Sequence, residues 1–138
     1  MTEPNQQYAY FTICGDFDPA EISALVGVVP TESWLKGDVS PSTHLERKFS
    51  RWSLHSRLER TRELEDHIGD VILQLCPRKL QFLEISLRYG GVMQLVAYFN
   101  THYPGYHWER ELVESLADYA LSVDFDLYYM YSDSREDS

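Results

Sequence analysis

Residues 8–27 read YAYFTICGDFDPAEISALVG, and this stretch decides how the fold begins. Its first part, residues 8–14, is rich in aromatic and β-branched side chains, which favours a β-strand. Asp18 followed by Pro19 is typical of a helix start, because the carboxylate accepts free amide protons and proline suits the first helical position. Gly27 is a common residue at a helix end. The stretch therefore predicts a strand followed directly by a short helix.

In the rest of the chain, apolar residues repeat along the sequence with two different spacings. Apolar residues at every second position indicate strands, whereas apolar residues three and four apart indicate helices. We therefore expect further strands at residues 49–55, 84–89, 92–99 and 122–130, and further helices at residues 61–76 and 108–120. The closing strand alternates most clearly between apolar and polar residues, which indicates that helices cover one face of the sheet.

Gly90 and Gly91 separate two of the expected strands and suit a two-residue hairpin turn. The predicted element order is then β-α-β-α-β-β-α-β, whose last six elements match a ferredoxin-like unit. With 138 residues, the chain is long enough for one domain, residues 1–138. We expect an α+β two-layer sandwich with a mixed or antiparallel sheet of about five strands and three helices on one face. Its ordered core spans residues 8–130, and residues 131–138 form an acidic tail.

The composition excludes several classes of protein. The chain has 22 acidic and 12 basic residues and a formal net charge of −10, so it repels phosphate backbones and we expect no nucleic-acid partner. It has no apolar run of the roughly 20 residues that span a bilayer, and no membrane partner is expected. The polar start, residues 1–7, is unlike a signal peptide. Two widely spaced cysteines, Cys14 and Cys76, are expected to pack and fit a reducing cytoplasm.

The charge is unevenly distributed along the chain. Residues 44–62 carry a net charge of +4, so the remaining residues carry −14. A negative surface steers and selects a basic protein partner, although solvated acidic faces also simply maintain solubility. The candidate partner-binding residues are Glu109, Glu111, Glu114, Asp118, Asp124, Asp126 and Tyr128.

No pattern that supports catalysis is evident. The five histidines form no i, i+4 pair on an expected helix, and there is no Cys-x-x-Cys spacing. We therefore expect no catalytic residues, no cofactor and no metal. A weaker hypothesis places a metal between His102 and His107 with Glu109 nearby, against the alternative that these histidines only form hydrogen bonds with their neighbours.

Two further groups of polar residues are candidates for a ligand site. Asp124 and Asp126 share one face of the closing strand, where they suit acid–base chemistry or a divalent cation. The alternative is the polar side of an edge strand whose carboxylates pair with arginines on neighbouring strands. The candidate ligand face comprises Arg51, Ser53, Ser86 and Arg88.

Ten tyrosines are many for a chain of this length. Most are expected to pack in the core or at its rim. A surface subset would resemble a protein interface, where tyrosine anchors a partner at low entropic cost.

The opening stretch also carries a family resemblance. Residues 11–30 contain Gly-Asp-x-Asp-Pro, a short helix and Gly-x-x-Pro, and they resemble the start of a bacterial family known as domain of unknown function 4279. The strand around Trp52, the helix of residues 64–75 and the closing residues 121–128 are also similar. The resemblance covers most of residues 8–129. It implies a small bacterial cytosolic protein, and it suggests neutralisation of a toxin encoded beside it, but it supplies no catalytic residues.

These observations lead to one main functional hypothesis and two alternatives. The main hypothesis is a non-enzymatic protein-binding module, in its narrower form an immunity protein that occludes a basic toxin. The first alternative is a small-molecule or metal-binding domain with hydrolytic activity. The second is a homo-oligomeric structural module, such as a homodimer, that pairs through an exposed sheet edge or face.

Overall fold

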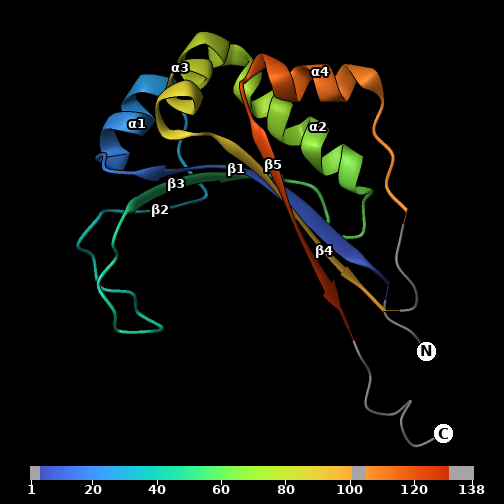
Figure 1. Cartoon of the computed structure of the whole chain (residues 1–138), viewed down its shortest axis with the longest axis horizontal. Helices are drawn as coiled ribbons and strands as arrows, with labels where there is room; N and C mark the ends of the chain where they lie inside the picture. The colour runs from blue at the N-terminus through green and yellow to red at the C-terminus, as the bar shows by residue number, and fades with distance from the viewer. Residues whose placement is uncertain (1–3, 101–104, 131–138) are drawn as a thin grey trace, which may run out of the picture.

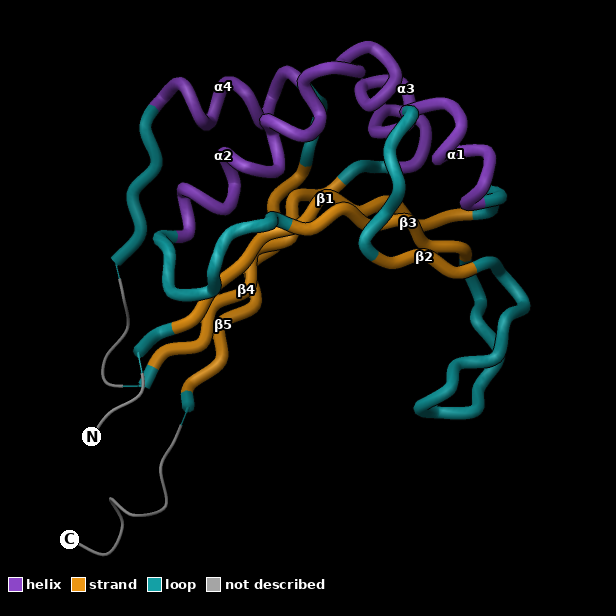
Figure 2. The backbone as a smooth tube through the Cα atoms, turned by 180° about the vertical axis from the view of Figure 1, so that it is seen from behind, coloured by secondary structure: helices purple, strands orange, loops and turns teal. Residues whose placement is uncertain are grey.

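The computed structural model describes residues 4–100 and 105–130, which form a mixed five-stranded sheet with helices on one face (Figures 1 and 2). The strands are β1 (Gln6–Gly15), β2 (Glu32–Trp34), β3 (Ser50–His55), β4 (Val92–Phe99) and β5 (Ser122–Tyr129). The helices are α1 (Pro19–Val26), α2 (Leu64–Leu75), the 3₁₀-helix η1 (Cys76–Arg78), α3 (Lys79–Tyr89) and α4 (Arg110–Asp118). This arrangement confirms the predicted α+β class.

The strands lie in the order β2-β3-β1-β4-β5. β1 is antiparallel to both β3 and β4, β2 is antiparallel to β3, and β4 is parallel to β5. The parallel pair requires a crossover, which α4 provides by packing on the helical side of the sheet (Figure 1). β2 and β5 are therefore the two edges of the sheet in the part of the chain that the structure describes.

The core lies between the sheet and the helices and follows from the alternation of β1. Phe11 and Ile13 point to the helical side and are almost fully buried. The ring of Phe82 on α3 meets Phe11 edge-on at 5.4 Å and lies 6.0 Å from Trp52 on β3. Burying rings of this size contributes much of the stability of such a fold. β1 is the central strand, and the strands beside it likewise turn one face to the core and the other to the open side of the sheet.

Helix α1 begins and ends as predicted. The side chain of Asp18 accepts a hydrogen bond from the backbone N–H of Ala20 at 2.9 Å, and Pro19 occupies the first turn. Gly27 ends the helix with φ +68°, a left-handed conformation that glycine adopts without steric cost.

Replacing Asp18 tests this cap. The variant Asp18→Ala is expected to lower the free energy of unfolding by about 1 kcal/mol, because one amide of the first turn loses its acceptor. Urea unfolding followed by circular dichroism measures the change. Asp16→Ala is the matched control, since Asp16 is exposed and only 3.8 Å from Lys36 in a surface ion pair. Equal losses in the two variants would contradict the cap.

The prediction of a strand at residues 84–89 is wrong, because this segment belongs to helix α3. Phe82, Ile85 and Ser86 are the buried residues of the helix, at the three-and-four spacing of one helical face. Leu80 and Leu87 are apolar but exposed, so in the sequence they obscure the three-and-four spacing of the buried residues. A six-residue window is too short to distinguish the two periods.

The predicted hairpin at Gly90–Gly91 is consequently wrong, and so is the ferredoxin-like element order. Gly90 has φ +69° and ends α3, where its N–H and that of Gly91 both donate to the carbonyl of Ser86. Gly91 is buried, and its carbonyl accepts from the N–H of Ser122 at the start of β5. The three expected helices are present as α1, α2 and α4, and α3 is the additional one among the described residues.

Gly91 has no room for a side chain. A Cβ atom there would contact Ser86, with 2.8 Å to its Cβ, and would lie 3.0 Å from Leu121. Gly91→Ala is therefore expected to lower the free energy of unfolding by about 2 kcal/mol. Gly69→Ala is the control, because a Cβ atom added to Gly69 within α2 would meet no atom within 4 Å, so alanine should stabilise the helix by about 0.5–1 kcal/mol. Urea unfolding of both variants tests the difference in sign.

Candidate functional site

The face of the sheet opposite the helices carries no covering layer of described residues (Figures 1 and 2). Tyr8, Tyr10, Thr12 and Cys14 of β1 alternate with its core residues and therefore lie on this open face. The strand register places His55 beside Tyr10 on one side. On the other side, β4 and then β5 continue the face outward to the edge of the sheet.

Aromatic rings stack across the open face. The ring of Tyr10 lies 4.5 Å from that of His55 and 6.1 Å from that of Tyr8, and Tyr98 stacks on Tyr128 at 5.0 Å. Burial raises the pKa of both Tyr8 and Tyr10 above the usual value for tyrosine. Aromatic rings with polar tips that are partly exposed on a surface are typical of protein interfaces.

Two of the predicted ligand-face residues lie on this face. Arg51 and Ser53 are on the open side of β3, as expected from its alternation. Ser53 is fully buried, and its hydroxyl is 2.8 Å from that of Thr12, so it joins two strands and does not contact solvent.

The other two, Ser86 and Arg88, do not join them, because the segment that carries them is helical. Ser86 is buried and donates its hydroxyl proton to the carbonyl of Ala120 at 3.1 Å. Arg88 is exposed at the end of α3, where its guanidinium lies 5.5 Å from the ring of Tyr89. The prediction that all four residues share one ligand face is therefore wrong for Ser86 and Arg88.

Asp124 and Asp126 share the open face of the edge strand β5, and both are exposed. The amide nitrogen of Gln94 donates to Asp126 at 3.0 Å. Pairing with Arg51 is excluded, because β1 and β4 separate β3 from β5. The alternative interpretation as the polar side of an edge strand fits this geometry, with Gln94 as the partner.

The predicted acidic partner-binding residues fall on two different sides of the molecule. Glu111, Glu114 and Asp118 lie on α4 in the helical layer, whereas the acidic residues of β5 lie on the open face. Two of the acidic residues near α4 have a basic side chain close by: Asp118 forms a surface ion pair with Lys79 at 3.7 Å, and a carboxylate oxygen of Glu109 lies 3.3 Å from Nε2 of His107. They do not form one patch.

The hypothetical metal site involves His102, which lies outside the described residues, as does the predicted acidic tail. Among residues 4–100 and 105–130, no group of three His, Cys, Asp or Glu side chains is placed to hold a metal ion. In the same part of the chain, no helix is long and apolar enough to cross a membrane.

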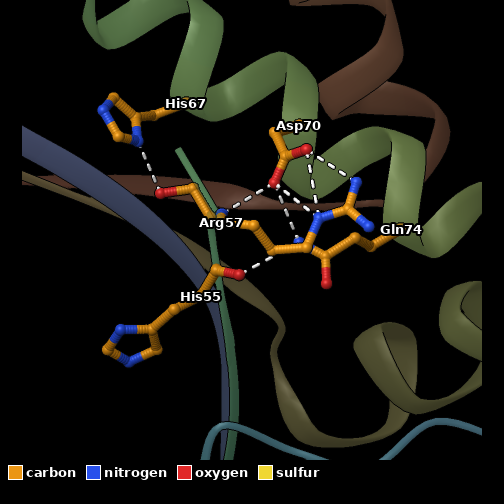
Figure 3. Close-up of polar contacts among 6 residues, drawn as sticks. His55, Arg57, His67, Asp70 and Gln74 are labelled. Atoms are coloured by element: carbon orange, nitrogen blue, oxygen red, sulfur yellow. Dashed lines mark hydrogen bonds and ion pairs between the residues drawn. The ribbon is translucent and has the colours of Figure 1, made fainter. Parts of the chain in front are cut away.

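A serine–histidine pair joins α2 to the segment after β3 (Figure 3). The hydroxyl of Ser56 lies 2.7 Å from Nδ1 of His67, and Nε2 of His67 lies 3.0 Å from the carbonyl of Glu59. Because a carbonyl only accepts, Nε2 of the neutral imidazole carries the proton, so the Ser56 hydroxyl donates to Nδ1 and also accepts the N–H of Ala9. His67 is fully buried and both of its ring nitrogens are engaged, so the pair links α2 to the chain segment that follows β3.

An ion pair next to this pair strengthens the same junction. Arg57 donates to Asp70 through its side chain at 2.7 Å and through its backbone N–H at 2.8 Å. Gln74 donates to Asp70 and to the carbonyl of His55, the last residue of β3 (Figure 3). Partial burial opposes ionisation of Asp70, but the hydrogen bonds from Arg57 outweigh it and leave the pKa of Asp70 below its usual value.

The histidines make stability depend on pH. Burial lowers the pKa of His67 and of His55 below the usual 6.5, so the unfolded chain binds more protons than the folded chain as pH falls below that value. Stability is therefore fully present above about pH 7 and is lost as the pH falls through the mildly acidic range.

Urea unfolding at pH 7.5 and pH 5.5 measures this loss. His67→Gln is expected to be less stable at pH 7.5 but to lose less further stability at pH 5.5. His44→Gln, which changes an exposed imidazole on the loop before β3, is the control and should keep the full pH dependence. An unchanged pH dependence in His67→Gln would show that the buried histidine does not cause it.

The sequence prediction missed a hollow at the β2 side of the open face. Residues 35–49, called the arm from here on, project from the sheet on the side away from the helices (Figures 1 and 2). Together with β1–β3 the arm borders an open hollow of about 340 Å³, which is called the cavity from here on. The only signal in the sequence was the positive charge of residues 44–62. It did not show that Trp34 of β2 and Cys14 of β1 line the same space.

Both cysteines are exposed, which corrects the expectation that they pack. Cys14 lies on the open face of β1 beside the arm, and Cys76 lies at the start of η1. Neither forms a disulfide within the described residues.

The described residues thus define an α+β protein with a sheet covered on one face only. Residues 5–130 match the family described as Domain of unknown function (DUF4279), so this chain belongs to that family. The match confirms the resemblance seen in the opening and closing stretches. No curated protein and no solved structure matches the chain. The family description names no activity, and the function is therefore argued from geometry.

Proposed function

We propose that this protein is a non-enzymatic protein-binding module that takes up a basic, extended segment of a partner along strand β5. The observation that carries the proposal is the outer edge of β5 over residues 122–128. In the described chain this strand pairs with β4 on one side and with no strand on the other. A free strand edge presents backbone N–H and C=O groups that a further strand can satisfy.

The side chains of β5 specify the chemistry of the added strand. On the open face it presents Asp124, Asp126 and Tyr128, and on the opposite face Val123 and Leu127 remain 41% and 45% exposed. A partner strand in which Lys or Arg alternates with apolar residues would pair charge with charge on one face and bury apolar surface on the other.

A second copy of the chain fits this edge less well than a basic partner. If two β5 strands paired antiparallel around a two-fold axis, the acidic side chains of both would lie on the same face and near one another. Like charges across neighbouring strands are destabilising. Charge thus favours a basic partner over the homodimer alternative.

The proposal is tested with a fluorescent peptide of alternating Lys and Val, whose binding is followed by anisotropy. The double variant Asp124→Asn/Asp126→Asn is expected to weaken binding by roughly fivefold, since each exposed charge pair contributes modestly. The matched control is Glu111→Gln/Glu114→Gln, which removes the same charge from exposed positions on α4 and should leave the affinity unchanged.

A second peptide separates strand addition from general charge attraction. The same sequence with N-methylated backbone amides at alternate positions keeps every charge but cannot complete the strand ladder. It is expected to lose binding. Equal affinity of the two peptides would overturn the proposal. Dimerisation of the Asp124→Asn/Asp126→Asn variant without binding of the parent peptide would also overturn it, since the carboxylates would then act only to block self-pairing.

The narrower form of the proposal is an immunity protein that occludes a basic toxin in a bacterial cytoplasm. The exposed, unpaired cysteines are compatible with a reducing compartment. Growth of cells that co-express the adjacent gene product with this protein or with the Asp124→Asn/Asp126→Asn variant tests this role. Equal protection by both would show that β5 is not the neutralising surface.

A further inference from the structure

We propose that the cavity beside the arm is a binding site for a small molecule that carries an oxyanion group, that is, a phosphate or a carboxylate. The cavity lies at the β2–β3 side of the sheet, whereas the edge proposed to bind a partner is β5, on the other side of the strand order. The inference is therefore independent of the proposed protein-binding function.

The floor of the cavity is a row of three residues on adjacent strands. Trp34 of β2 is the register partner of Arg51 of β3, which is in turn the partner of Cys14 of β1. All three line the cavity, together with Arg47 and Lys48 of the arm. A volume of about 340 Å³ is within the range of small-ligand sites.

The cations of the cavity are not neutralised by carboxylates. Within the described residues, Arg47, Lys48 and Arg51 have no carboxylate oxygen within 4.0 Å, and Glu46 is the one acidic residue in the lining. The chain as a whole has 22 acidic and 12 basic residues, so acidic partners are abundant elsewhere on it. Three cations around one hollow therefore leave a local positive potential that attracts an anion.

One of these cations has an unused buried donor. The Nε atom of Arg51 is buried and has no hydrogen-bond partner among the described residues. A buried polar group without a partner costs free energy, so such groups are rare in native proteins. Arg51 also lines the cavity, where an oxyanion would supply an acceptor for its guanidinium, because the planar fork of that group matches phosphate and carboxylate geometry.

Trp34 holds the guanidiniums in position. The guanidinium of Arg47 stacks over its ring at 3.7 Å, and that of Arg51 lies 5.6 Å from the ring centre. Trp34 is itself fixed by a hydrogen bond from its indole N–H to the carbonyl of Phe49 at 3.1 Å. Stacking uses the face of a guanidinium and leaves its N–H groups, which lie in the plane, able to donate to a ligand.

The arm is also held in place by its own hydrogen bonds. The backbone N–H of Arg47 donates to the carbonyl of Asp38 at 2.7 Å, and the N–H of Gly37 donates to the carbonyl of Arg47 at 2.9 Å. Lys36 donates its backbone N–H to the hydroxyl of Ser50 at the start of β3. A preformed wall lowers the ordering cost of binding.

The experiment titrates the protein with inorganic phosphate, phenyl phosphate and benzoate while the indole N–H signal of Trp34 is followed by NMR. Comparison with Trp34→Phe assigns that signal. The signal is expected to shift and saturate with at least one probe. Phenyl phosphate against inorganic phosphate tests the contribution of an apolar body, and benzoate distinguishes a carboxylate site from a phosphate site.

Arg51→Gln is expected to weaken binding of the effective probe by at least about tenfold, because it removes a charged donor from the cavity floor. Arg51→Lys keeps the positive charge but loses the planar, forked guanidinium, so it should recover only part of the affinity. Arg47→Gln, on the exposed arm, gives an independent variant if the β3 substitutions reduce folding. Arg110→Gln on α4 is the matched control and should bind like the parent protein.

Two results would overturn the inference. One is the absence of any shift of the Trp34 signal with all three probes up to roughly 10 mM, the range of very weak binding. The other is an equal loss of affinity in Arg110→Gln and Arg51→Gln, which would indicate general charge attraction and no site. Neither result bears on peptide binding at β5, so the two proposals fail separately.

Discussion

The arrangement of this protein depends on the burial of one face of a sheet while the other face stays open. Phe11 at the centre of β1 packs against Trp52 and Phe82, and this contact determines which side of the sheet meets the helices. Because side chains alternate along a strand, the same contact determines that Tyr8 and Tyr10 face outward. Every candidate binding feature on the sheet follows from that division.

The strand order then separates two chemistries that are mixed along the chain. The acidic β5 lies at one edge of the sheet, and the cationic cavity is lined by the arm and by β1, β2 and β3, so that β4 lies between them. A strongly acidic protein can in this way keep a hollow with an excess of positive charge, because Glu46 is the one acidic residue that lines it beside Arg47, Lys48 and Arg51. Under the two proposals, each side of the sheet takes a partner of opposite charge, a basic strand at β5 and a small oxyanion at the arm.

Local signals predicted the parts of the fold that depend only on neighbouring residues. Asp18, Pro19 and Gly27 act within one helix, so its start and end could be identified without knowledge of the rest of the chain. The segment that became α3 could not be assigned in this way. Its exposed leucines weaken the apolar stripe, and it is helical because Phe82 and Ile85 fit the core at helical spacing. The placement of Ser86 on a ligand face failed for the same reason.

The sequence by itself determined the α+β class, the family and the one-sided alternation of the long strands, because these depend on composition and on residues close together in the chain. Only the tertiary structure decided that Cys14, Trp34 and Arg51 lie in one row, and that the aspartates of β5 lie at an edge far from any arginine of β3. Strand order and register bring together residues that are distant in sequence. No local period encodes which strands become neighbours, since that choice depends on how the whole core packs.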